Sequence, residues 1–100
     1  MPLVNPYGSS PTSSKAIPTT IAAATATTPL LAENPARKGA TIWNNSNNTL
    51  FIDLGATAAA TAYTAKLISG GYYELPFGYT GAISGIWDGT NGNCFVRELT

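Results

Sequence analysis

The chain lacks most of the side chains that enzymes use for proton transfer and nucleophilic attack. Its 100 residues include no histidine and one cysteine, Cys94. Histidine is the usual proton shuttle near neutral pH and the commonest metal ligand, and the serines and threonines have no such base to activate them. A lone cysteine forms no internal disulfide and no thiolate cluster. We therefore expect no enzyme activity, no cofactor and no metal site, and we interpret Cys94 as a small buried hydrophobe.

The carboxylates form no evident acid/base pair. They lie in different expected elements: Glu33, Asp53, Glu74, Asp88 and Glu98. A glycosidase places two carboxylates around one bond, so only the fold could bring such a pair together here. Residues 88–93 (DGTNGN) resemble a calcium loop, yet they lack a second carboxylate and the bidentate glutamate, and we interpret them as a turn.

Charged residues are few and balanced. Five Lys plus Arg and five Asp plus Glu give a net charge of zero, and charged residues make up 10% of the chain, against about 25% in a typical soluble domain. The cations are too few and too scattered to neutralise a nucleic-acid backbone. A weakly charged exterior favours association. These features predict a structural or binding protein with much of its surface covered by partners, none of them nucleic acid.

No segment predicts export or a membrane partner. The first 15 residues lack the basic and apolar regions of a secretory signal. The stretch 21–32 (IAAATATTPLLA) is short, Thr-rich and interrupted by Pro29, so it does not predict a membrane span. We expect a soluble protein made in the cytoplasm.

The first 18 residues differ in composition from the rest. This Ser/Thr-rich tract is punctuated by four prolines and has few apolar side chains to bury: Leu3, Val4, Tyr7 and Ile17. Such a tract cannot offset the entropy of ordering by itself. We expect residues 1–18 to be an extended N-terminal arm and residues 19–100 to be one small domain.

That domain has the pattern of an all-β protein. Apolar and polar residues alternate in short runs, and turn signals recur every 8–12 residues. We expect seven or eight short strands in an antiparallel β-sandwich or jelly roll. Three turn signals each predict a hairpin: the Asn/Ser cluster 45–48, Gly70-Gly71 and Asn91-Gly92. Residues 55–62 (GATAAATA) predict either a loop or a loose edge strand.

The aromatic residues allow three interpretations. Trp43, Tyr73, Phe77 and Trp87 could fill a small core, which is the interpretation we favour. A set that also includes Tyr72 and Tyr79 could instead anchor a protein interface or form a platform for stacking sugars.

Two stretches together resemble small β-rich virion proteins of tailed double-stranded-DNA bacteriophages. They are residues 30–55 (LLAENPARKGATIWNNSNNTLFIDLG) and 70–100 (GGYYELPFGYTGAISGIWDGTNGNCFVRELT). The shared pattern is an Asn and an Arg before a strand ending in Asn, a hairpin ending in Leu-Gly, a Gly-Gly-aromatic step and a closing Gly–hairpin–Thr-Glu-like tail, which here reads Arg97-Glu98-Leu99. An arm joined to a compact domain looks most like a capsid cement, or decoration, protein.

The resemblance implies a particle component without catalytic residues. Such proteins sit on the outer surface of the phage head and clamp neighbouring subunits of the major capsid protein. We expect a homo-oligomer, a dimer or a trimer. The candidate contact residues are Leu3, Val4, Tyr7 and Ile17 in the arm and Tyr72 and Tyr79 on the body. A tail, baseplate or fibre-associated adaptor, with or without glycan binding, is the alternative.

Overall fold

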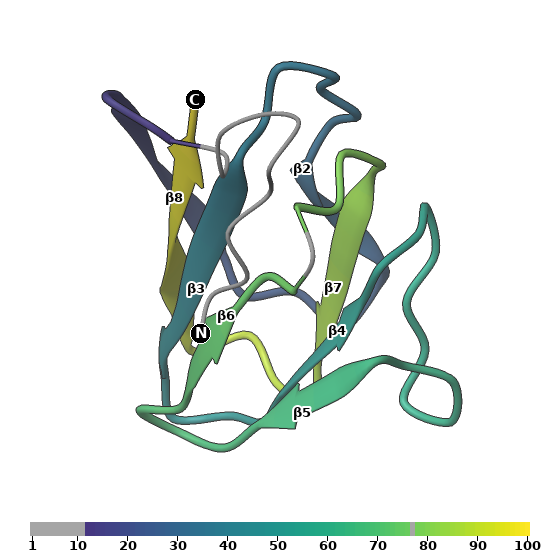
Figure 1. The fold of residues 1–100 in the computed structure, drawn as a ribbon. Helices are drawn as coiled ribbons and strands as arrows, with labels where there is room; N and C mark the ends of the chain where they lie inside the picture. The colour runs from purple at the N-terminus through teal and green to yellow at the C-terminus, as the bar shows by residue number, and fades with distance from the viewer. Residues whose placement is uncertain (1–11, 77) are drawn as a thin grey trace.

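Eight strands form two antiparallel sheets that pack face to face (Figure 1). The computed structural model describes residues 12–76 and 78–100, and these contain no helix. The strands are β1 (Ala16–Ala22), β2 (Thr28–Leu31), β3 (Gly39–Ser46), β4 (Leu50–Asp53), β5 (Ala65–Leu67), β6 (Tyr72–Glu74), β7 (Ile83–Trp87) and β8 (Gly92–Leu99). The prediction of an all-β antiparallel sandwich is confirmed.

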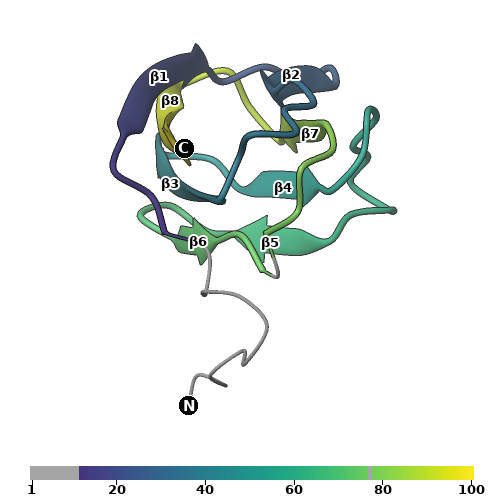
Figure 2. The ribbon, with the colours of Figure 1, turned by 45° about the horizontal axis from the view of Figure 1, so that its top comes forward.

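The strand order is that of a jelly roll. Sheet I has the order β1-β8-β3-β6 and sheet II the order β2-β7-β4-β5. Strands equally far from the two ends of the chain pair with each other: β1 with β8, β2 with β7, β3 with β6 and β4 with β5. The β8–β3 and β7–β4 pairings then close each sheet. This is one long hairpin rolled into two layers, which Figure 2 shows as two facing walls.

The three hairpins predicted from turn signals are wrong. In each case the strands on either side of the turn lie in different sheets: β3 and β4, β5 and β6, and β7 and β8. A hairpin within one sheet and an arch between two sheets have the same sequence signals, a tight turn and alternating side chains. The signals are the same because in both cases one face of each strand packs on the core. Gly92 does adopt a positive φ of 101°, but it begins β8 after such a crossing.

The core lies between the two sheets. Inward-facing side chains that are almost fully buried include Ile42, Leu50, Ile52, Ile83, Trp87, Cys94 and Val96. Tyr73 packs against this cluster, so Trp87 and Tyr73 are core residues as predicted. Trp43 is not, because half of its surface is exposed. Phe77, the fourth predicted core aromatic, lies outside the described residues.

A buried arginine ties the connecting segments together at one end of the sandwich. Arg37, in the β2–β3 connection, donates from Nε to Oε2 of Glu98 on β8 over 2.8 Å. Its Nη1 donates to the carbonyls of Tyr79 and Gly81, and its Nη2 to that of Ala32. All of its polar atoms are therefore used inside the protein, which is the condition under which a buried cation is stable.

The first strand begins inside the segment expected to be the arm. β1 starts at Ala16, and Ile17 and Pro18 lie opposite Glu98 and Arg97 of β8. The edge of sheet I therefore includes residues 16–18. Leu3, Val4 and Tyr7 lie outside the described residues.

A candidate docking face on sheet I

The outer faces of the two sheets differ in how they are covered. On sheet II, Phe51 points away from the core between the buried Leu50 and Ile52. The ring of Tyr63 packs on Phe51 with 5.0 Å between ring centroids. Tyr63 belongs to the β4–β5 connection, residues 54–64, which lies on the side of sheet II away from sheet I (Figure 2). This connection is fixed farther along by the bond from the Ala58 amide to Thr27 Oγ1. The protein thus covers Phe51 itself, while the covering Tyr63 stays 41% exposed.

The outer face of sheet I instead exposes three aromatic side chains in one row. Strand pairing places Tyr72 of β6 opposite Trp43 of β3, and Trp43 opposite Phe95 of β8. Their neighbours Ile42, Cys94 and Val96 point inward and are buried, so the three rings must point outward. Tyr72, Trp43 and Phe95 are 58%, 51% and 40% exposed. We call these three residues the aromatic row.

Two rings of the aromatic row contact each other, and the third bonds to a flanking residue. Trp43 and Phe95 meet edge to face, with ring centroids 6.4 Å apart and planes at 81°, a favoured arrangement for aromatic pairs. The Tyr72 hydroxyl donates to Glu74 Oε2 over 3.3 Å. The pKa of Tyr72 is raised, first by partial desolvation and then by the charge of Glu74 and its hydrogen bond. Tyr72 therefore stays neutral and remains a hydrogen-bond donor.

Polar residues flank the row on both sides. One flank carries Glu74, Thr41 and Arg97, which lie opposite one another on β6, β3 and β8. The other carries Asn45 and Asn93, joined by a 3.0 Å bond from Asn45 Nδ2 to Asn93 Oδ1. Glu74 and Arg97 are the only charged residues at outward positions of the four strands of sheet I. We call the aromatic row and these five flanking residues the docking face.

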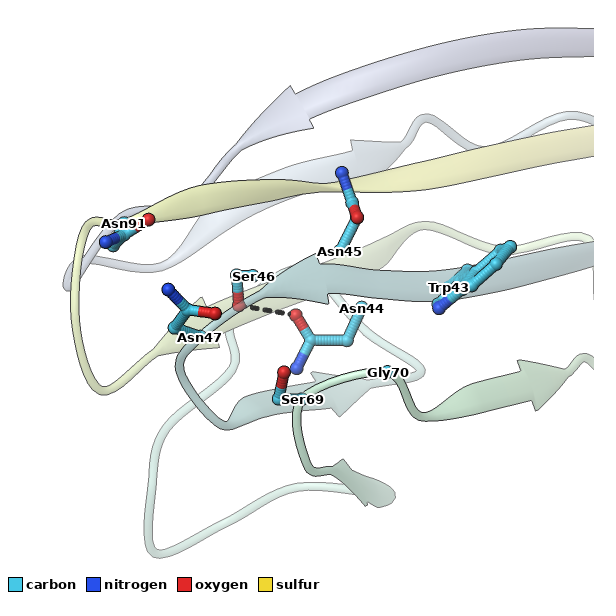
Figure 3. A pocket seen from close by; sticks show the side chains of 8 residues that line it. All are labelled: Trp43, Asn44, Asn45, Ser46, Asn47, Ser69, Gly70 and Asn91. Carbon is cyan, nitrogen blue, oxygen red and sulfur yellow. Dashed lines mark hydrogen bonds between the residues drawn. The ribbon is translucent and has the colours of Figure 1, made fainter.

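A small polar hollow lies where β3 leaves the docking face (Figure 3). Its volume is about 210 Å³, and its lining is Trp43, Asn44, Asn45, Ser46, Asn47, Ser69, Gly70 and Asn91. None of these side chains is ionisable. The hollow can therefore offer amide and hydroxyl groups beside one indole ring, but no charge and no acid or base.

Buried Asn44 holds the walls of this hollow in place. Its Nδ2 donates to the carbonyls of Asn48, Leu67 and Ile68, and its Oδ1 accepts from the Ser46 hydroxyl at 2.6 Å. One side chain thus joins the β3–β4 arch to the β5–β6 arch. Figure 3 shows Asn44 pointing to the Ser69–Gly70 turn and Asn45 pointing to the other side of the strand.

The predicted contact residues do not all lie together. Tyr72 belongs to the docking face. Tyr79 is half-buried against the core and its hydroxyl donates to the Ala82 carbonyl over 2.9 Å, so it orders a loop. Ile17 is 41% exposed on β1, at the edge of sheet I. Leu3, Val4 and Tyr7 lie outside the described residues.

The sequence favours Trp43 as a core residue, with the interface only an alternative, and it does not single out Phe95. The signal that could have revealed Trp43 is its alternation with Ile42 in the segment ATIWN. It was obscured because the next inward residue, Asn44, is polar, and because a tryptophan is more easily assigned to a core. Phe95 could have been found in the same way, since Cys94 and Val96 flank it as inward residues.

The described residues offer little reactive chemistry. In residues 12–76 and 78–100 no group of three or more His, Cys, Asp or Glu could hold a metal ion. Burial raises the pKa of the Cys94 thiol to about 12, so the nucleophilic thiolate is suppressed. The same residues include no helix long and apolar enough to cross a membrane.

Comparison with known proteins adds no relative: no protein-family model, no curated protein and no solved structure matches this chain.

Proposed function

We propose that this chain is a virion structural protein of a tailed bacteriophage, a capsid cement protein that binds the outer surface of the head and clamps neighbouring subunits of the major capsid protein. The observation that carries the proposal is the uncovered aromatic row on sheet I. Three large rings remain exposed in one row on a chain that covers part of its other sheet itself. Such a surface is typical of a site that another protein covers.

The chemistry of the docking face suits a protein contact. Aromatic side chains bury a large area with few rotatable bonds, and they dominate the energy of many interfaces. Only two ionised groups, Glu74 and Arg97, would have to be desolvated or paired on docking. The cost of covering this face is therefore small compared with that of a typical charged protein surface.

The assignment to the head rests on the resemblance and on the layout of the chain. The resemblance of residues 30–55 and 70–100 is to phage virion proteins, and a jelly roll is a recurrent fold of viral shells. A fold alone does not give a function, so the resemblance is the more specific support. Many copies on one shell would multiply weak individual contacts. An arm reaching from β1 along a neighbouring subunit would clamp two subunits together.

Re-decoration of particles tests the proposal. Virions made without the chain would be incubated with purified variants, and bound protein and heat resistance of the particles would be measured. Deleting residues 2–14 keeps β1 intact, together with the Lys15 carbonyl that accepts from the Thr100 amide. We expect this deletion to reduce particle binding and heat resistance. Trp43→Ala should also reduce binding, whereas Tyr63→Ala on sheet II is the matched control.

Two results would refute the proposal. One is that the deletion variant and Trp43→Ala decorate and protect the particles as well as the unaltered chain. The other is that the chain, labelled and imaged on the particle, lies on the tail or baseplate, which would favour the adaptor alternative.

Glycan binding by a fibre-associated protein is a second candidate, favoured by the hollow beside Trp43. An exposed indole beside Asn45, Asn47 and Asn91 can stack on a sugar ring while the amides bond to its hydroxyls. Titration with neutral saccharides, followed by tryptophan fluorescence, tests this candidate. Since Trp87 is buried, a response that is lost in Trp43→Phe would support it, and the absence of any response at millimolar saccharide would exclude it.

A further inference from the structure

We propose that the docking face of sheet I binds the same face of a second copy of this chain, with a two-fold axis running along β3. The inference rests on the proposed function in one respect, that protein covers this face, and it names the covering partner. Three observations carry it: the register of the strands, the positions of the two charges and the size of the face.

The register makes the face complementary to itself. Sheet I has the order β8-β3-β6 around its third strand. A two-fold axis along β3, between two facing copies, therefore places β6 of one copy over β8 of the other. Tyr72 then lies over the partner's Phe95, and Trp43 lies over the partner's Trp43. The aromatic row of one copy thus packs on the aromatic row of the other. The twist of the two sheets sets the angle between them, as in other packed sheets.

The same axis pairs the two charges of the face. Glu74 and Arg97 both lie opposite Thr41, one on each side of β3. Rotation about β3 brings Glu74 of one copy over the partner's Arg97, and the reverse pair forms by symmetry. Among the described residues the one ion pair is that of Arg37 with Glu98, so both charges are available for this contact. A C2 interface requires self-complementarity of this kind.

The size of the face predicts a weak dimer. At ~4.8 Å between strands and ~3.3 Å per residue, three strands with ~7 residues on β3 and β8 give a patch of at most roughly 14 by 23 Å, and it is shorter at β6, which has 3 residues. That is smaller than the interface of a permanent dimer. We therefore expect dimerisation to depend on protein concentration in solution and to be favoured on a particle, where copies are held close together.

Charge reversal tests this arrangement directly. Sedimentation velocity of the full chain would be followed between about 1 μM and 1 mM, the range in which a weak interface dissociates. Arg97→Glu and Glu74→Arg each replace the two symmetry-related ion pairs of the dimer by two pairs of like charges. Each variant should therefore weaken dimerisation at least about tenfold. The double variant Glu74→Arg/Arg97→Glu restores the pairing and should return the dissociation constant to within about threefold of the original.

Two controls separate the interface from the fold. Lys66→Glu changes the net charge by as much as Arg97→Glu, but Lys66 is an exposed residue of β5 in sheet II, away from this face. It should leave dimerisation unchanged. The fluorescence of buried Trp87 would confirm that each variant is folded.

The outcomes distinguish this inference from the proposed function. Three results would overturn the two-fold arrangement. They are a chain that stays monomeric at all concentrations, a chain that forms a trimer, and single variants whose loss of dimerisation the double variant does not reverse. If such a chain still decorates phage heads, only the inference fails. If a saccharide changes the fluorescence of Trp43 while the chain stays monomeric, a glycan and not a second copy is the ligand of this face. Rescue by the double variant supports the dimer even if no particle is bound.

Discussion

Replacement of Arg37 should destabilise the fold more than replacement of any surface charge. Its side chain is fully buried and bonds to the Glu98 carboxylate and to three backbone carbonyls. In Arg37→Met these acceptors lose their donor while the stem of the side chain keeps its volume. Breaking a buried ion pair by removal of one partner costs about 3–5 kcal/mol. This is a large part of the roughly 5–15 kcal/mol that stabilises a typical domain.

Matched variants divide this cost among the bonds. Arg37→Lys keeps the charge but cannot reach four acceptors, so an intermediate loss of roughly 2 kcal/mol is expected. Glu98→Gln leaves the three carbonyl bonds intact and should cost about 1–2 kcal/mol. The double variant Arg37→Met/Glu98→Gln should cost less than the sum of the two single changes, because the second removes a carboxylate that the first leaves unpaired.

Urea unfolding, followed by the fluorescence of buried Trp87, measures these free energies. The reasoning is refuted if Arg37→Met unfolds within about 1 kcal/mol of the unaltered chain, the range of ordinary surface substitutions. It is also refuted if Glu98→Gln costs more than Arg37→Met.

Three further predictions concern single residues. Gly92→Ala should lose at least about 1 kcal/mol of unfolding free energy, because φ is +101° and a Cβ would lie 2.6 Å from Ser46 Cα; urea unfolding no different from that of the unaltered chain would contradict this. Burial raises the pKa of Cys94 in the folded chain from 9.0 to about 12, so its contribution to stability is complete below pH 9 and is lost as the pH rises toward 12. In Cys94→Ala the unfolding free energy should therefore fall less between pH 9 and pH 12 than in the unaltered chain. Equal falls in the two proteins would contradict this prediction. Trp43→Ala should change stability by less than about 1 kcal/mol, since half of its surface is exposed; a larger loss would assign Trp43 to the fold instead of to binding.

The sequence allowed the fold class to be predicted but not the path of the chain. Alternation in segments such as residues 49–54 reports that one face of a strand is buried. It does not report which strand lies beside it. The arch between β7 and β8 ends at Asn91-Gly92, a strong hairpin signal, yet it crosses from one sheet to the other. Pairing between distant strands decides this, and a single sequence carries little information about it.

The candidate site was predicted only in part for a related reason. Tyr72 was expected on the surface, and it lies there. The size and hydrophobicity of Trp43 favour a core position. The buried residue beside it is instead Asn44, whose polar atoms are satisfied by three carbonyls and a hydroxyl. Partners of that kind come from other segments of the folded chain. The same is true of Arg37, whose acceptors lie up to 61 residues away along the sequence.

The most direct test of the central claim, that the docking face of sheet I is covered by protein in the virion, is hydroxyl-radical footprinting of the free chain and of the decorated particle. The account predicts that oxidation of Trp43, Tyr72 and Phe95 falls on the particle, while oxidation of Tyr63 on sheet II changes less. Equal oxidation of Trp43, Tyr72 and Phe95 in both states would contradict it.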